Sequence, residues 1–106
     1  MLITSTFDIA DKKIVKTLGL VKGNTIRARH VGRDIMAGLR GIVGGELHEY
    51  TKLLAESREQ ALDRMIEDAE KLGADAVVGV SFSTSVMSQG AAELMAFGTA
   101  VVIEES

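Results

Sequence analysis

The chain has 106 residues, of which 46% are apolar and 25% charged, and its formal net charge is −3. This composition predicts one globular domain over residues 1–106, with no broad attraction to nucleic acid or to an anionic membrane. The sequence has no cysteine, no apolar run long enough to span a membrane and no signal peptide, which excludes disulfides and thiolate ligands and predicts a cytoplasmic protein.

The first third of the chain predicts strands joined by turns. Leu2 to Phe7 is rich in Ile and Thr, and Ile14 to Val21 is a second apolar run, with the polar segment Asp8 to Lys13 between them. Lys22-Gly23-Asn24 predicts a turn, after which Thr25 to Val31 continues the sheet.

The next segment is rich in glycine. Asp34 to Val43 predicts a short helix, and Gly44-Gly45 then breaks the chain. Backbone N–H groups at such a corner, ahead of a long helix, are able to hold an anion, and Arg33 and Arg40 would add positive charge. The segment lacks the Gly-Lys-Ser/Thr of a phosphate loop, so a plain corner between two helices is the simpler alternative.

A long helix is expected from Glu46 to Leu72, with Gly73 as its C-terminal cap. One face of it is apolar at helical spacing. The residues of this face are Leu47, Tyr50, Leu54, Ala61, Met65, Ala69 and Leu72, widened by Leu53, Leu62 and Ile66. The helix would be about 40 Å long. Because a compact domain of this size is about 33 Å across, we expect the helix to extend beyond it.

Two strands are expected after the helix, Ala74 to Val86 and Glu93 to Ile103, joined through a turn at Ser88-Gln89-Gly90. Alternation places large side chains on one face of these strands, namely Ala76, Val78, Val80, Phe82 and Val86 with Met95, Phe97, Val101 and Ile103. The other face carries mostly small side chains, namely Val77, Gly79, Ser81, Ser83 and Ser85 with Leu94, Ala96, Gly98, Ala100 and Val102.

Five stretches, spread over nearly the whole chain, have the sequence and the spacing of a known family. They are RDIMAGLRGIVGG at 33–45, Tyr50, LAESREQALDRM at 54–65, LGADAVVGV at 72–80 and GTAVV at 98–102. Together they resemble the YbjQ-like family, whose domain is catalogued as heavy-metal-binding. The resemblance implies a β-α-β-β unit similar to the dodecin subunit, assembled as a homopentameric ring. Arg40-Gly41 stands where the family often has Arg-Asp, so a site built on that carboxylate is in doubt here.

Residues 48–52 read HEYTK, a near-match to the His-Glu-x-x-His motif of zinc proteases. His48 and Lys52 would share one helix face, but lysine has no lone pair near neutral pH and cannot complete the site. The only other histidine is His30, and no spacing joins the two into a closed ligand set. We therefore expect no metal and no cofactor, and we interpret His48 as a solvated residue.

The serines of Gly79-Val-Ser81-Phe-Ser83 lack the second glycine of a nucleophile elbow. No nucleophile, base and orienting group come together in the sequence, so we expect no catalytic residues. The ligand or anion site, if the chain has one, is predicted to draw on the following residues: Arg33, Asp34, Arg40, Gly44, Gly45, Glu46, Tyr50 and Arg58.

Arg58 falls near the middle of the apolar helix face. A buried guanidinium needs a carboxylate or several carbonyls, because burying it unpaired is costly. Asp34 is the first candidate partner and Asp75 the second. The alternative is that Arg58 snorkels to the edge of the helix.

These observations predict an α+β protein with a mainly antiparallel sheet, one long helix and ring assembly. The function that they favour is a non-enzymatic oligomeric module that binds a small ligand or anion. The alternative is a metal-binding or metal-sequestering protein, or an enzyme, with its site between subunits. The expected partner is the chain itself, with no nucleic acid and no membrane.

Self-assembly is predicted from the length of the helix and from the sheet, of which one helix covers only one face. The small-residue face lacks the charge of a solvated surface, so we expect the helix on the large-residue face and another subunit on the small-residue face. The family resemblance supplies the number five. The alternative is a monomer whose N-terminal strands fold over that face.

Overall fold

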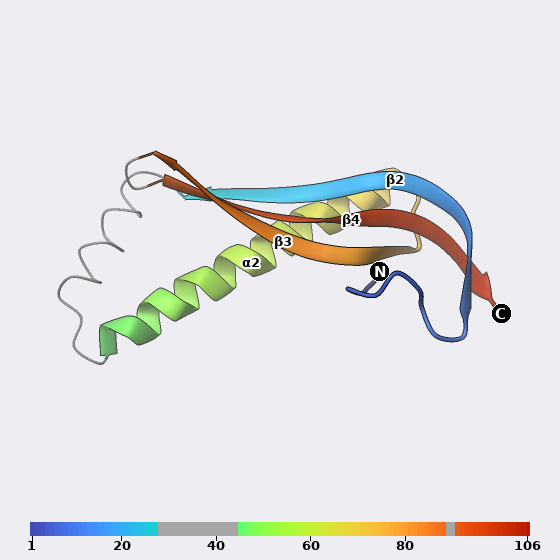
Figure 1. Ribbon diagram of the computed structural model, residues 1–106, viewed down its shortest axis with the longest axis horizontal. Helices are drawn as coiled ribbons and strands as arrows, with labels where there is room; N and C mark the ends of the chain where they lie inside the picture. The colour runs from blue at the N-terminus through green and yellow to red at the C-terminus, as the bar shows by residue number, and fades with distance from the viewer. Residues whose placement is uncertain (28–44, 89–90) are drawn as a thin grey trace.

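The computed structural model describes residues 1–27, 45–88 and 91–106, which form a four-stranded sheet with one long helix beside it (Figure 1). The elements are β1 (Leu2–Ile3), β2 (Lys12–Arg27), α2 (Gly45–Lys71), β3 (Ala76–Ser88) and β4 (Ala91–Glu105). The strand order is β1-β3-β4-β2, in which β1 is parallel to β3 and the other neighbours are antiparallel. This confirms the α+β class and a β-α-β-β unit, with β1 added at one edge. The predicted short helix at residues 34–43 lies outside the described residues.

β1 is shorter than the predicted strand from Leu2 to Phe7. After Ile3 the threonine hydroxyls bond locally, since the Thr6 amide donates to Thr4 Oγ1 (3.2 Å) and the two hydroxyls are 2.9 Å apart. Such local bonds compete with a regular strand ladder. The segment still follows β3, because Thr4 N donates to Val77 O (3.0 Å) and Gly79 N donates to Thr6 O (2.8 Å).

β2 runs without a turn through Lys22-Gly23-Asn24, so the prediction of a turn there was wrong. Gly23 is buried where α2 crosses the strand. A Cβ atom at this position would overlap the carbonyl oxygen of Ala61 and the amide nitrogen of Met65. The glycine therefore serves close packing of helix on strand, which the sequence pattern alone does not separate from a turn.

α2 confirms the long helix to within one residue at each end. It ends in the predicted cap: Gly73 has φ +79°, Gly73 N donates to Glu70 O (3.0 Å) and Ala74 N donates to Ala69 O (3.2 Å). These two bonds form a Schellman motif and satisfy carbonyls that the helix end would leave unpaired.

The helix covers the small-residue face of the sheet, which corrects the prediction that it would cover the large-residue face. Ala61, Met65 and Ala69 of α2 are fully buried in one cluster with Val21, Val77, Ala96 and Ala100. Small side chains on β4 let the helix approach closely. Gly98 is buried in the same region, where a Cβ atom would lie 2.7 Å from Val77 Cγ1. The small-residue face is thus largely covered by the helix of the same chain.

A β-bulge explains why the faces were misassigned. The register between β3 and β4 shifts between Val78 and Ser81, at Gly79, whose φ is +64°. Ala76 and Val78 pack with Val101 on the face opposite α2, whereas Val80 packs against the helix-side cluster. One extra residue in a strand moves every later side chain to the other face.

Candidate functional site

The predicted anion corner falls mostly outside the described residues. Arg33, Asp34, Arg40 and Gly44 lie there, as does His30. Gly45 and Glu46 form the first turn of α2, and Tyr50 and the HEYTK stretch follow on the same helix. The helical geometry that the sequence predicted for these residues is therefore confirmed, and their grouping into a ligand site stays a prediction.

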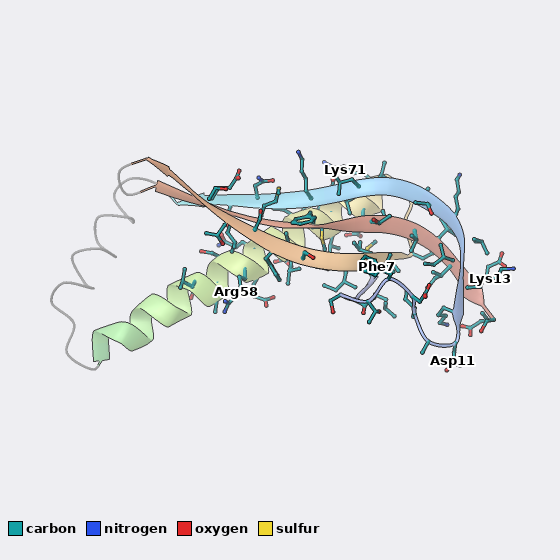
Figure 2. All side chains as sticks on the ribbon, in the orientation of Figure 1. Phe7, Asp11, Lys13, Arg58 and Lys71 are labelled. Carbon is teal, nitrogen blue, oxygen red and sulfur yellow. The ribbon has the colours of Figure 1, made fainter. Side chains whose placement is uncertain are left out.

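Arg58 is exposed on α2, on the side away from the strands in Figure 2. Among the described residues it forms no ion pair with Asp75, whose carboxylate instead accepts a bond from Ile103 N (3.0 Å). The prediction of a buried arginine is wrong for the single subunit. The reason is that the sheet buries the row Ser57, Ala61, Met65 and Ala69, whereas Arg58 lies beside this row, one turn before the half-buried Leu62, and its guanidinium stays in water.

The helix leaves the sheet near its middle (Figure 1). Ser57 is the first described residue of α2 that is buried, and its carbonyl accepts a bond from Thr25 Oγ1 (3.3 Å). Leu54, one turn earlier and on the same face as Ala61 and Met65, is 41% exposed. The apolar face of α2 therefore continues past the end of its contact with the sheet.

A shallow hollow lies where α2 meets the β1–β3 edge. It has a volume of about 220 Å³ and is lined by Ile3, Thr4, Ser5, Leu62, Val80 and Phe82. The sequence pattern did not predict this hollow, because alternation without a bulge places Phe82 on the same face as Ala76 and Val78, away from Leu62 of α2. The glycine at position 79 was the signal that could have found it, since an isolated glycine within a strand is typical of a bulge.

The described residues offer few side chains that could bind a metal ion together. No group of three His, Asp or Glu side chains close enough to hold a metal ion occurs within residues 1–25, 54–85 and 93–106. Heavy metals favour thiolate ligands, and the chain has no cysteine. None of the described helices combines the length and the apolar character of a membrane span.

The fold and these surfaces define a small α+β domain with one long helix whose apolar face is exposed at Leu54. A family model described as "Putative heavy-metal-binding" matches residues 1–104, and the chain belongs to this YbjQ-like family. It is 61% identical over 103 residues to a UPF0145 protein of Methanosarcina acetivorans, with 97% of each chain covered. It is 59% identical over 104 residues to a UPF0145 protein of Hahella chejuensis, covering 98% of this chain and all of that one.

A solved structure has a similar fold. A crystal structure of a protein of unknown function from the DUF74 family of Pediococcus pentosaceus aligns with a TM-score of 0.65 over 98% of both chains. At 16% sequence identity this likeness concerns the fold alone.

Proposed function

We propose that the protein is a non-enzymatic binding module that works as a homo-oligomeric ring in the cytoplasm. The observation that carries the proposal is the apolar face of α2, which continues beyond the sheet at the exposed Leu54. The family resemblance supplies five as the number of subunits.

Packing energetics support a partner for this part of the helix. Most of the stability of a protein helix comes from packing its apolar face, and a stretch that leaves the sheet loses that support. Full burial of one leucine side chain contributes about 1.5–3 kcal/mol. Leu20, 69% exposed on the opposite side of the subunit, offers a second apolar contact. A head-to-tail ring covers both kinds of surface in every subunit alike.

The proposed ligand is a small molecule or anion held at the start of α2. Backbone N–H groups of a first helical turn bind anions, and Gly45 lets a ligand approach the backbone closely. Arg33 and Arg40 would supply charge, and Tyr50 a hydroxyl. In a ring these helix ends come from several subunits, so the site would be shared between neighbours.

Size-exclusion chromatography with light scattering tests the assembly. A mass of five subunits of 11.3 kDa, or a multiple of five, supports the ring. A mass near 11.3 kDa throughout the micromolar range contradicts it. Native mass spectrometry of the same sample tests the ligand: an added mass that recurs once per subunit supports binding, and bare subunits from several preparations speak against it.

The family description favours a second candidate, a metal-sequestering protein with a site between subunits. Metal analysis of protein purified without a histidine tag separates the two. We expect less than one tenth of a metal ion per subunit after desalting, because cysteine is absent and HEYTK lacks its second histidine. Stoichiometric zinc, copper or nickel that disappears in His48→Ala or His30→Ala would replace the first proposal with the second.

A further inference from the structure

Within the described part of the chain, the outer edge of β3 is paired only along its first part. β1 and the segment after it bond to this edge up to Val80, whose amide donates to Thr4 O (3.0 Å). Beyond Val80, none of the described residues pairs with the outer edge, although β3 continues to Ser88. Figure 1 shows this part of β3 running past the N-terminal segment toward the far end of the sheet.

The direction of the backbone groups follows from Val80. Successive residues of a strand direct their N–H and C=O groups to alternate sides. Because the Val80 N–H points to the outer edge, the N–H and C=O groups of Phe82 and Thr84 point there as well. Ser81 and Ser83 then direct theirs to Phe97 and Met95 of β4. Four backbone groups thus face outward at two neighbouring positions.

This edge also lacks the usual protection against pairing. Natural edge strands carry charged side chains, proline or bulges that keep other strands away. From Ser81 to Val86 the sequence SFSTSV has no charge and no proline, and its pairing with β4 has no register shift. Phe82, 44% exposed, and the hollow beside it form an apolar margin along the same edge.

The opposite edge, β2, is protected in two ways. It carries Lys12, Lys13, Lys16 and Lys22. At Lys22 and Asn24 two side chains of α2 also cover it. Asp68 Oδ2 accepts a bond from Lys22 N (3.2 Å), and Arg64 Nη1 donates to Asn24 O.

The protected part of β2 and the open part of β3 lie at the same level of the sheet. Lys22 stands opposite Phe97, which stands opposite Ser81, and Asn24 stands opposite Met95, which stands opposite Ser83. Extending the sheet in register from one subunit to the next would place the open edge of β3 against the covered edge of β2. Arg64 and Asp68 therefore oppose that contact.

We propose that the outer edge of β3 from Phe82 onward binds the same edge of a second copy, antiparallel across a two-fold axis. Such pairing satisfies the outward groups of Phe82 and Thr84 in both copies and covers the exposed Phe82 rings. It brings no like charges together, because the segment is uncharged, whereas β2 paired with itself would oppose its lysines. This isologous contact is distinct from the head-to-tail contacts of the proposed ring and would join two rings or two single subunits.

The test uses Thr84→Pro, with Thr17→Pro as the matched control. Proline removes an outward N–H while leaving the bonds to β4. Thr17 of β2 stands opposite Val101, whose carbonyl accepts a bond from Asp75 N on the β3 side, so Thr17 also faces the outer edge of its strand. We expect Thr84→Pro to halve the particle mass measured by light scattering at high micromolar concentration, and Thr17→Pro to leave it unchanged. A mass unchanged by Thr84→Pro overturns the proposal, as does an equal loss in Thr17→Pro, which would indicate pairing of β3 with β2.

Hydrogen exchange of the unaltered protein provides a measurement that does not depend on folding of the variants. We expect the amides of Phe82 and Thr84 to gain at least tenfold protection as the concentration rises through the range where the mass doubles. Protection that is already complete in the dilute, smaller particle would mean that the chain covers this edge itself, and would overturn the proposal. If the protein forms no ring, the hydrogen-exchange measurement still tests this proposal, because single subunits would still pair through β3.

Discussion

Gly23 is the residue on which the contact between helix and sheet depends most. Gly23→Ala puts a Cβ atom into the backbone of α2 at Ala61 and Met65, which cannot move as a flexible side chain does. We expect a loss of about 1–3 kcal/mol in the free energy of unfolding. Urea denaturation at a fixed protein concentration measures it.

Lys22→Ala is the control for that substitution. The Lys22 side chain is exposed, and its backbone bond to Asp68 does not need the side chain. We expect a change within about 0.5 kcal/mol. Equal losses in the two variants would mean that Gly23 is not a packing position.

Arg58→Met tests the exposure of Arg58 in the assembled protein. Since the guanidinium is in water in the subunit, we expect the free energy of unfolding to change by less than about 0.5 kcal/mol. Arg64→Met is the comparison, because its guanidinium bonds to Asn24 O, and it should cost about 1 kcal/mol. A loss of several kcal/mol or of assembly in Arg58→Met would indicate a buried ion pair formed between subunits.

At the scale of the elements, α2 depends on its C-terminal cap. Gly73 has a left-handed φ of +79°, and a Cβ atom there would meet nothing within 4 Å. Gly73→Ala therefore tests conformation without a steric clash, and we expect a cost of about 1–2 kcal/mol. Gly73→Asn should cost less, because asparagine tolerates this region better. Thermal unfolding followed by circular dichroism measures both, and equal costs would contradict the assignment.

The elements show what local sequence predicts and where it stops. The periodicity of residues 46–72 and the glycine after them were enough to predict α2 and its end. A glycine in a strand-like sequence can mark a turn, a β-bulge or a site of close packing. Which of these roles it has depends on residues far away in the chain. Gly23 is close to Ala61 and Met65, and Gly79 lies beside the N-terminal segment, so both were misinterpreted. The error at Gly79 then moved Val80 and Phe82 to the wrong face.

For the whole molecule, the sequence predicted the class better than it predicted the shape or a site. The expectation that the helix is longer than its domain was wrong, because the 16 residues of β2, at about 3.3 Å each, are longer than the 27 residues of α2, at about 1.5 Å each. The candidate residues from Arg33 to Tyr50 are neighbours in the chain, so a local pattern was able to group them. Arg58 was added from helix geometry alone, on the assumption that the apolar face is covered along its whole length. In the structure the sheet buries the row Ser57, Ala61, Met65 and Ala69, whereas Arg58, beside this row, and Leu54, one turn before it, are exposed. This difference is a property of tertiary structure.

The apolar face of α2 is longer than the part that the sheet buries, and this leads to a prediction about assembly. If the uncovered part of α2 packs on a neighbouring subunit, a charge at Leu54 must be buried or must break the contact. Burying an unpaired carboxylate is too costly, so Leu54→Glu should reduce the particle to one or two subunits. Leu72→Glu is the matched control, since Leu72 is 49% exposed and Leu54 41%, but Leu72 lies at the other end of the helix, where the sheet already covers α2. Light scattering should give the unaltered mass for Leu72→Glu, with both variants keeping the circular dichroism of the parent. If Leu54→Glu also keeps the mass, the ring is held by another surface, and the apolar face opposite α2, with Leu20, is then the next to change.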